Sequence, residues 1–345
     1  FNGNFLQGQI PRSIIHCKEL KVIDFGNNQL NDTFPCELKR LSKLQVLILR
    51  SNKFSGSIDC QKENSTWSSL QILDLASNHF SGDLKPQYFV NWTSMMAGMN
   101  KSQPEQDHLQ YRFTDEYGLY EDSVGVTFKG RNFELPKILR IFASIDLSKN
   151  AFHGEIPIEL GILNALIVLN LSHNSLWGRI PSSLGNLRQL ESFDLSCNNM
   201  NGNIPQELAN LNFLGYLNLS FNKLAGPIPT GTQLQSFNPS SYEGNLGLYG
   251  PPLTPSSRSK DAPGLPPPTC LEESAWSGDN VVEWMLRGAE IGYPVGLAIF
   301  IGPLLYIRRW RQWYCKHLQR VAMKVLHKEN WPSGRRRSNK RERSR

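Results

Sequence analysis

Two cysteines of this chain have a spacing that predicts a cross-link. Cys36 and Cys60 are separated by one period of the repeat described below, and each follows an apolar residue by two positions. Equivalent positions on adjacent coils of a stacked repeat have about the Cα separation that a disulfide requires. We therefore predict a Cys36–Cys60 bridge, with two reduced core cysteines as the alternative. Cys17 and Cys197 are expected to be buried or wall cysteines.

Asn-x-Ser/Thr triplets provide the second kind of chemistry, the attachment of glycans. All of them precede an apolar segment near the C-terminus and none follows it, which is typical of a glycosylated extracellular region. The predicted acceptors are Asn31, Asn64, Asn91, Asn100, Asn170 and Asn218.

Catalytic chemistry finds no support in the sequence. The six cysteines lack the close pairs of a zinc site, and no Ser/His/Asp constellation is present. The C-terminal segment 308–345 lacks a Gly-rich loop and HRD-type or DFG-type motifs, which excludes a kinase domain there. We therefore predict a protein that is not an enzyme and that uses no cofactor.

Marker asparagines reveal the elements that position these residues. Asn150, Asn174, Asn198 and Asn222 follow one another at equal intervals of about 24 residues, each ending the pattern L-x-x-L-x-L-x-x-N. The alternating apolar residues of such a short strand point into one core, and stacked copies form a parallel sheet. Upstream, Asn4, Asn28 and Asn52 keep this period, and Asn78 follows after 26 residues.

The pattern predicts core and binding residues separately. Leu, marker Asn, Gly and Pro positions are expected to build the core and the turns, because the amide of Asn can satisfy backbone groups that a coil leaves unpaired. Recognition is expected at the variable positions of the strands, which should be exposed. These candidate contact residues are Asp146, Lys149, His173, Asp194 and Phe221.

An insertion interrupts the repeats. Asn78 and Asn150 are separated by three repeat periods instead of one, so the length of two further repeats is inserted between them. The segment 85–140 is rich in Tyr, Phe and Met and ends in a strand-like stretch. It is either a contact surface for a ligand or a spacer whose apolar residues pack on the repeats, and the sequence leaves both interpretations open.

The C-terminal part has the organisation of a single-pass membrane protein. Residues Ile291–Ile307 are uncharged and long enough to cross most of a bilayer as a helix. After them come 14 Lys and Arg against two Glu, a net charge of +12, whereas the rest of the chain has 23 basic and 28 acidic residues. This asymmetry places the tail in the cytoplasm and the repeats outside, and behind such a helix nucleic-acid binding is not expected.

Small residues mark one face of the predicted membrane helix. Gly288, Gly292 and Gly296 recur every four residues, which allows another helix to approach closely or simply tolerates the kink at Pro294. Acidic residues precede this helix, namely Glu272, Glu273, Asp279 and Glu283.

These features define the expected organisation, a parallel β-sheet solenoid of 24-residue repeats with an island insertion, followed by a single transmembrane helix. The predicted segments are repeats at 1–84, the insertion at 85–140, repeats at 141–230, a cap and Pro-rich linker at 231–270, an acidic juxtamembrane stretch at 271–287, the helix at 288–307 and a short basic tail at 308–345.

The repeat consensus with L-x-G-x-I-P resembles the plant-specific class of leucine-rich repeats. The segments "LQVLILRSNKFSGSI", "YFVNW", "KILRIFASIDLSKN" and "SYEGNLGLYGPPL" are similar to plant receptor-like proteins of the Verticillium wilt disease-resistance and Cf type. This resemblance covers the chain to about Leu318. The family has a Cys where this chain has Tyr249, which leaves Cys270 without the partner that the resemblance implies.

The resemblance implies a receptor at the plasma membrane that perceives a pathogen-derived protein or peptide. It implies an adaptor receptor kinase bound through the membrane helix and acidic stretch, and a co-receptor kinase bound through the repeats from Ile145 to Phe221. A developmental peptide receptor of the same architecture and a secreted leucine-rich-repeat inhibitor are the alternatives.

Overall fold

The computed structural model describes residues 1–60, 67–96, 110–113, 116–119, 123–136, 138–139, 141–230 and 233–253. All of them belong to one compact unit, Phe1–Cys270. The predicted membrane helix, its glycine face and the acidic stretch lie outside the described residues. In the part of the chain that is described, no helix has the length and apolarity needed to cross a bilayer.

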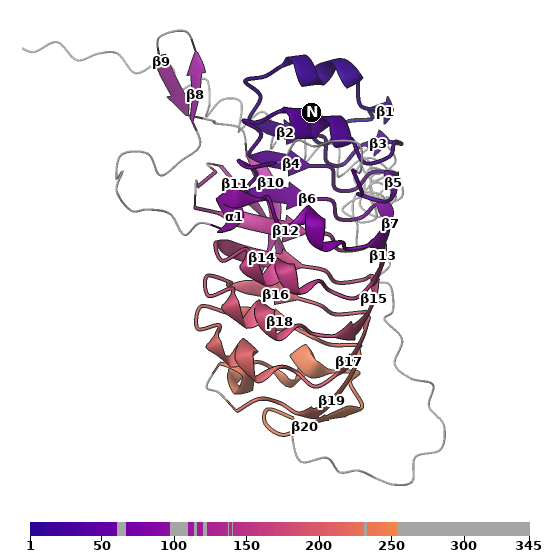
Figure 1. The fold of residues 1–345 in the computed structure, drawn as a ribbon, viewed down its shortest axis with the longest axis vertical. Helices are drawn as coiled ribbons and strands as arrows, with labels where there is room; N and C mark the ends of the chain where they lie inside the picture. The colour runs from indigo at the N-terminus through magenta and orange to yellow at the C-terminus, as the bar shows by residue number, and fades with distance from the viewer. Residues whose placement is uncertain are drawn as a thin grey trace, which may run out of the picture. The chain divides into compact units, whose positions relative to one another are not determined.

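The described residues form coils stacked one above the next (Figure 1). Each coil contributes one short strand to a seven-stranded parallel sheet, here called the first sheet. Strands with alternate apolar residues pair in this way because every neighbour presents the same core face. The strands are β2 (Val22–Asp24), β4 (Val46–Ile48), β6 (Ile72–Asp74), β12 (Ala143–Asp146), β14 (Leu166–Asn170), β16 (Ser192–Asp194) and β18 (Tyr216–Asn218).

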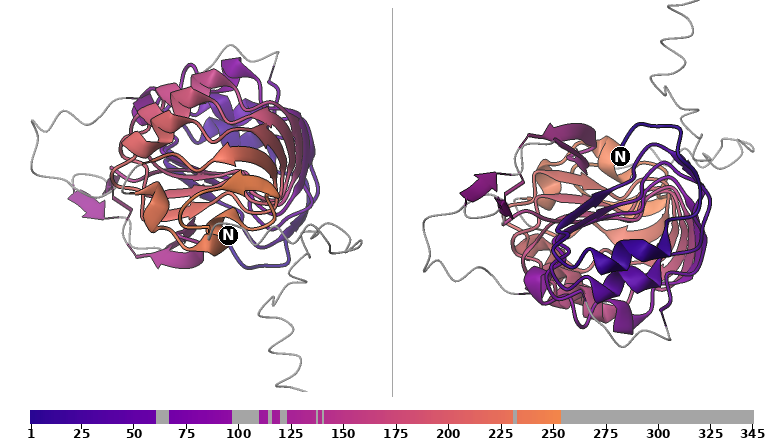
Figure 2. Two further views of the ribbon diagram at one scale, coloured as in Figure 1. Left: turned by 90° about the horizontal axis from the view of Figure 1, so that it is seen from below. Right: turned by 90° about the horizontal axis from the view of Figure 1, so that it is seen from above.

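A second seven-stranded parallel sheet forms another wall of the stack. Viewed along the stack, the coils superpose around a common interior (Figure 2). The strands of this second sheet are β5 (Ser55–Gly56), β7 (His79–Asp83), β13 (Ala151–Gly154), β15 (Ser175–Arg179), β17 (Asn199–Gly202), β19 (Lys223–Pro227) and β20 (Gly247–Tyr249), and β1 (Gln7–Gly8) pairs separately with β3 (Gln29–Leu30).

Short 3₁₀ helices complete the coils. Pro157, Pro181 and Pro205 stand directly before three of them, where no backbone N–H is needed and the restricted φ of proline suits the entry. The helices are η1 (Arg12–His16), η2 (Cys36–Arg40), η3 (Pro86–Tyr88), η4 (Ile158–Ile162), η5 (Ser182–Asn186), η6 (Gln206–Asn210), η7 (Leu234–Ser236) and η8 (Pro239–Tyr242).

The predicted core residues line the interior. Leu166, Leu169 and Leu171 are at most 1% exposed, as are the residues at the same positions of the next coil, Leu190 and Phe193. A row of phenylalanines runs through the interior, with the Phe80 ring stacked at 5.9 Å from Phe54 and at 6.3 Å from Phe152. The apolar core is therefore continuous along the stack.

The marker asparagines form a hydrogen-bonded ladder. The Nδ2 of Asn198 donates to the carbonyls of Leu195 and Ser196 in its own coil and of Leu171 in the coil before it. Its Oδ1 accepts the N–H of Leu176 at 3.0 Å. Buried backbone groups need such partners, so one side chain satisfies four groups that the turn leaves unpaired.

The insertion begins later than the sequence predicts. Residues after Lys85 were expected to leave the repeat, but Tyr88, Phe89, Trp92 and Met95 are buried in the main core. Tyr88 ends η3 and Met95 lies in α1 (Thr93–Met96), and the carbonyl of Met95 accepts the N–H of Ala165 at 2.9 Å. The boundary at residue 85 is therefore wrong, because these aromatic residues complete a coil.

The cap closes the last coil with a further member of the ladder. Asn245 donates to Leu219, Tyr242 and Glu243 and accepts the N–H of Leu224, as the marker asparagines do in the repeats. The buried Tyr242 hydroxyl donates to the Leu234 carbonyl at 2.6 Å. The cap therefore satisfies the backbone groups that the solenoid would otherwise leave unpaired at this end.

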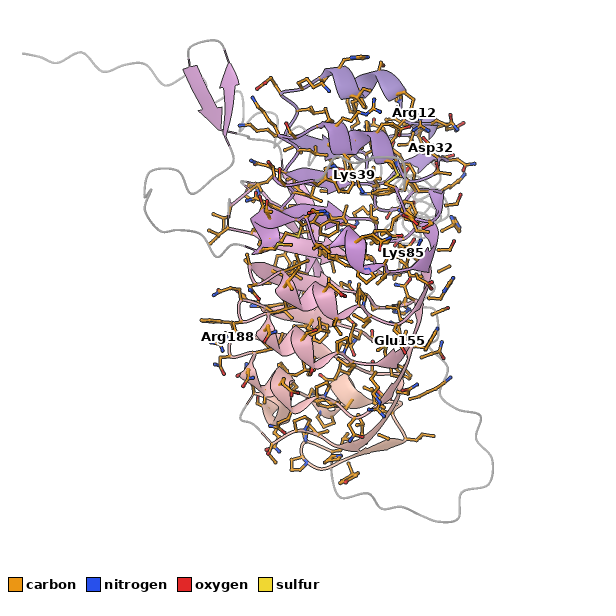
Figure 3. All side chains as sticks on the ribbon, in the orientation of Figure 1. Arg12, Asp32, Lys39, Lys85, Glu155 and Arg188 are labelled. Atoms are coloured by element: carbon orange, nitrogen blue, oxygen red, sulfur yellow. A yellow bond between two sulfur atoms is a disulfide. The ribbon has the colours of Figure 1, made fainter. Side chains whose placement is uncertain are left out.

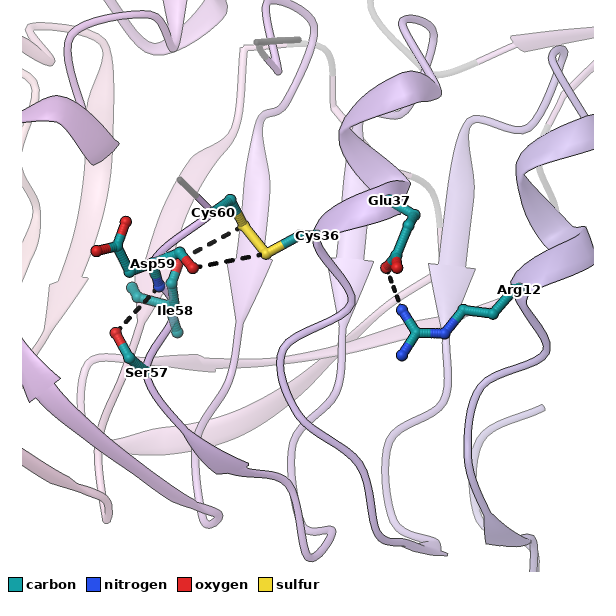
Figure 4. Close-up of a disulfide and its surroundings, with 7 residues drawn as sticks. All are labelled: Arg12, Cys36, Glu37, Ser57, Ile58, Asp59 and Cys60. Carbon is teal, nitrogen blue, oxygen red and sulfur yellow. Dashed lines mark hydrogen bonds and ion pairs between the residues drawn. A yellow bond between two sulfur atoms is a disulfide. The ribbon is translucent and has the colours of Figure 1, made fainter. Parts of the chain in front are cut away.

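A disulfide joins the coils that carry Cys36 and Cys60 (Figure 4), with 5.5 Å between their Cα atoms. Near it, Arg12 forms an ion pair with Glu37. Cys17 was expected to be buried or in the wall, but it is exposed and free at the end of η1. Cys197 is half-buried and disulfide-bonded.

Candidate ligand-binding face of the first sheet

The residues of the first sheet that point away from the core form two columns. Strand alternation places them between the core residues, and the parallel register aligns each with its equivalent on the next strand. The first column is Val22, Val46, Ile72, Ser144, Val168, Ser192 and Tyr216, and the second is Asp24, Ile48, Asp74, Asp146, Asn170, Asp194 and Asn218. We call this surface the outward face.

The candidate contact residues divide between the second column and the turn that follows it. Asp146 and Asp194 occupy the column, while Lys149, His173 and Phe221 each stand one residue before a marker asparagine. These three have φ values of 52° to 53°, a left-handed conformation that is unusual for such side chains. The structure therefore places all five residues along one edge of the outward face.

Asp146 is not exposed as the sequence predicts, since it is only 2% exposed. Its Oδ1 accepts the N–H of Ser148 at 3.0 Å, and its Oδ2 has no hydrogen-bond partner among the described residues. The repeat pattern places the residue on the outward face correctly. The prediction of exposure fails because another part of the chain covers this face.

A hairpin from the insertion covers part of the outward face. It consists of β10 (Val124–Phe128) and β11 (Arg131–Leu135), which pair in antiparallel register. Val124 and Val126 are at most 1% exposed and pack in a second apolar cluster apart from the main core. The sheet contributes to this cluster the apolar residues Val46, Ile48, Ile72 and Val168, with Val22 and Ile167 at its margin.

Polar contacts hold this hairpin at two places. The Arg50 guanidinium donates to the Thr127 hydroxyl at 3.2 Å and lies 3.1 Å from the Asp74 carboxylate. At the turn of the hairpin, Lys129 pairs with Glu191 at 3.0 Å, and its N–H donates to the Ser192 hydroxyl at 3.0 Å. The hairpin therefore crosses the face from the coil of Arg50 to the coil of Ser192.

The hairpin turn requires a glycine where it meets the sheet. Gly130 has a φ of 72°, and a Cβ built on it would lie 2.8 Å from the Tyr216 ring. No larger residue fits this close approach with that backbone conformation. The turn is therefore shaped to rest on the ring of Tyr216.

Burial alters the acidity of the covered carboxylates. Asp74 and Asp146 are register partners on adjacent strands, and both are almost fully buried. Burial, reinforced by the Asp146 charge and opposed by Arg50, raises the pKa of Asp74 to about 7. Asp74 therefore keeps its proton to a higher pH than an aspartate in water does.

The coils at the turn end of the hairpin carry a repeated polar arrangement. Asn170, Asp194 and Asn218 each accept, through Oδ1, the N–H and hydroxyl of the serine two residues later. Tyr216 donates to Asp194 Oδ2 at 3.2 Å. Burial raises the pKa of Asp194, and burial together with the Asp194 charge raises the pKa of Tyr216 to about 12. This part of the face presents amide, carboxylate, hydroxyl and imidazole groups.

The predicted glycan acceptors have very different surroundings. Asn31 and Asn91 are exposed, Asn218 is half-buried, and Asn170 lies in β14 at 8% exposure. In the folded chain Asn170 is therefore poorly placed for modification, because it belongs to the sheet itself. Asn64 and Asn100 lie outside the described residues.

Charged side chains elsewhere form pairs between coils near the second sheet (Figure 3). Lys85 pairs with Asp59, and Arg12 lies 3.8 Å from the buried Asp32. In each pair the acidic side chain is largely buried and the basic one is exposed. Among the described residues, no group of three or more His, Cys, Asp or Glu could hold a metal ion.

Sequence reasoning missed the covered part of the outward face, although a signal was present. The segment Val46–Leu49 is an uninterrupted apolar run, whereas a strand with one solvated face alternates apolar and polar residues. Its side chains, Val46 and Ile48 included, are fully buried. Apolar residues on both faces of a strand would have predicted a covering element here.

The comparisons with known proteins agree with this architecture. The family model described as Leucine Rich Repeat matches residues 69–92, 165–187 and 189–211. The chain is 49% identical over 294 residues to Receptor-like protein 35 of Arabidopsis thaliana, covering 85% of this chain and 30% of that protein. Receptor-like protein 43 of the same plant is 45% identical over 316 residues, which cover 91% of this chain and 43% of that protein.

A solved structure shares the fold. The leucine-rich-repeat ectodomain of the Arabidopsis thaliana receptor kinase GASSHO1/SCHENGEN3, in complex with CASPARIAN STRIP INTEGRITY FACTOR 2, matches with a TM-score of 0.52. It is 29% identical, and the match covers 73% of this chain and 27% of that one. The chain belongs to the leucine-rich-repeat receptor-like proteins of plants. It spans less than half the length of the curated relatives described above.

Proposed function

We propose that this chain is the membrane-proximal part of a plant cell-surface immune receptor. In this proposal its ectodomain binds a pathogen-derived protein or peptide, and it signals through partner receptor kinases. The observation that carries the proposal is the outward face at the turn end of the hairpin, where polar and aromatic groups come from successive coils. These residues are His173, Asp194, Tyr216, Asn218 and Phe221. Such groups on a preformed scaffold suit recognition of a protein or peptide surface.

The insertion supports this placement of the ligand site. Its hairpin lies across the outward face and ends beside Ser192 and Tyr216, next to the polar coils. A ligand lying along the sheet would therefore meet the hairpin turn as well as the strands. The two interpretations of the insertion are compatible here, because the apolar side of the hairpin packs on the solenoid while its turn borders the proposed site.

A ligand-binding experiment tests the proposed face with matched histidine variants. We expect His173→Glu to weaken ligand binding at least tenfold, because it puts a negative charge beside Asp194 within the site. His153→Glu makes the same chemical change on the second sheet, where His153 pairs with Asp83 at 2.8 Å, and should leave binding within about twofold. Binding of the full chain is measured against secreted proteins of a fungal pathogen and against synthetic secreted plant peptides.

The probe that binds separates the immune proposal from its alternative. A fungal protein whose binding depends on His173 supports the immune receptor. A plant peptide with the same dependence supports the developmental receptor. If both histidine variants bind the ligand equally well, the ligand does not bind at the outward face.

Partner kinases are proposed to bind at two other places. The co-receptor kinase would contact the C-terminal repeats, where Trp177 on β15 is 50% exposed and large enough to anchor an interface. The adaptor receptor kinase would contact the membrane helix through Gly288, Gly292 and Gly296, with the acidic stretch beside it. Both proposals place the chain at the plasma membrane with its repeats outside.

Co-precipitation from plant cells distinguishes these two contacts. We expect Trp177→Ala to reduce recovery of the co-receptor kinase severalfold and to leave adaptor recovery unchanged. Replacing Gly292 and Gly296 by Leu should reduce recovery of the adaptor kinase severalfold and leave recovery of the co-receptor kinase unchanged. Phe213→Ala, which removes another exposed aromatic ring, is the control for nonspecific loss. Wild-type recovery of both kinases by both variants would contradict the proposed contacts.

A further inference from the structure

The hairpin of the insertion covers a buried charge imbalance. Asp74 and Asp146 are register partners on β6 and β12, and they are 2% exposed each. One guanidinium, that of Arg50, forms an ion pair with Asp74 Oδ2 at 3.1 Å. Neither Asp74 Oδ2 nor Asp146 Oδ2 has a hydrogen-bond partner among the described residues. Two buried carboxylates beside one half-buried cation leave a negative charge, which is unfavourable away from water.

The groups around this pair do not neutralise it. Asp24 on β2, in the second column of the outward face, adds a further negative charge near Asp74. Lys149, in the turn after β12, is exposed. The hairpin contributes to Arg50 only the neutral acceptors Thr127 and Asn132, at 3.2 and 3.5 Å.

The charged residues of the hairpin are engaged elsewhere or exposed. Lys129 pairs with Glu191 at the far end of the hairpin, and Arg131 and Glu134 are exposed. The simplest way to balance the buried charges is therefore one proton on the Asp74–Asp146 pair. With one of the two carboxyls neutral, the remaining carboxylate and Arg50 carry no net charge together.

We propose that hairpin β10–β11 is a proton-dependent lid on the outward face, closed while the Asp74–Asp146 pair holds one proton and released as that proton is lost. Arg50 links the two parts, since it contacts Asp74 and the Thr127 hydroxyl of the hairpin at once. Opening lets water reach both carboxylates and stabilises their charged forms. It also exposes Val46, Ile48 and Ile72, which extend the polar face with an apolar surface.

The direction of the pH dependence follows from proton binding. The pKa of Asp74 is raised to about 7 by burial and by Asp146, against an ordinary value of 3.8 when water surrounds it. The closed state therefore binds more protons than the open state between these values, and closure weakens as the pH rises through this range. Above about pH 7 both states are ionised, and the dependence levels off.

Amide hydrogen exchange of the purified full chain measures the opening directly. After correction for intrinsic exchange, the opening constant of hairpin amides 124–135 should rise at least tenfold between pH 5 and pH 7, with a limit of about tenfold per pH unit for one proton. Amides of β14 and β16 in the same sample report global unfolding and should not follow this rise. No ligand is present, so this test is independent of the proposed function.

Two asparagine variants identify the responsible pair. Asp74→Asn should abolish the pH dependence and keep the hairpin protected at pH 7, and Asp146→Asn should shift the dependence to lower pH. Asp83→Asn, which removes an exposed carboxylate on the second sheet, should retain the wild-type profile. A flat wild-type profile, or a slope that persists unchanged in both Asp74→Asn and Asp146→Asn, overturns the proposal.

Discussion

Replacing Asn198 by alanine is expected to lower the free energy of unfolding by about 4 kcal/mol, since several buried groups lose their partner at once. The Asn198 side chain is 8% exposed and makes hydrogen bonds of 2.9 to 3.2 Å with four backbone groups of two coils. Its removal leaves the N–H of Leu176 and three carbonyls without this partner in the interior. A buried group left unpaired costs about 1–3 kcal/mol, partly recovered where water enters.

The adjacent asparagine provides a control with the same side chain. Asn199 is exposed at the start of β17, so Asn199→Ala should change the free energy of unfolding by less than about 0.5 kcal/mol. Urea unfolding followed by circular dichroism measures both variants. If Asn198→Ala were as stable as Asn199→Ala, the hydrogen-bonded ladder would not be a main source of the stability of the solenoid.

Replacing Phe80 by alanine is expected to destabilise the chain by about 3–5 kcal/mol. Phe80 is fully buried, stacks on Phe54 and Phe152, and meets the edge of Phe34 at 6.0 Å. The loss combines the hydrophobic transfer of the ring, the cavity that it leaves and its aromatic contacts. Because Phe80 precedes the insertion and Phe152 follows it, the substitution acts where the two blocks of repeats join.

Two further substitutions are controls for Phe80→Ala. Phe80→Leu keeps most of the apolar volume and should lose roughly half as much stability. Phe5→Ala removes a ring that is 85% exposed and should have little effect. Thermal unfolding of the three variants checks this order. A loss for Phe80→Ala below about 1 kcal/mol, well under the usual cost of a buried ring, would mean that the two blocks are held together by other contacts.

The repeat architecture could be predicted because each coil carries the same pattern of core residues and marker asparagine. Leu169, Phe193 and Leu217 occupy the same core position on neighbouring strands, and a marker asparagine follows each of them. Nearest-neighbour stacking needs only this local pattern, so periodicity alone indicates the sheet, its register and its core. The cap asparagine, Asn245, was missed because its distance from the preceding marker is slightly shorter than the repeat period and because it lacks the full leucine pattern.

The state of the outward face could not be predicted in the same way. Asp146 and Asp194 occupy equivalent positions, and the repeat pattern describes both as exposed. Asp146 is almost fully buried and Asp194 is half-buried, since Val124 and Val126 of a distant segment pack over strands next to Asp146. That packing joins residues with no shared period, so nothing in the repeat indicates which coils are covered.

The sequence by itself determined the stack of coils, its apolar core and the asparagine turns, because these depend on contacts between neighbouring copies of one pattern. Only the tertiary structure decided that Pro86–Met96 completes a coil and that β10–β11 divides the outward face into a covered part and an open part. The physical reason is that burying apolar surface is favourable whether the apolar partner is near or far in the sequence. For Val46 and Ile48 that partner lies in the insertion, far along the chain.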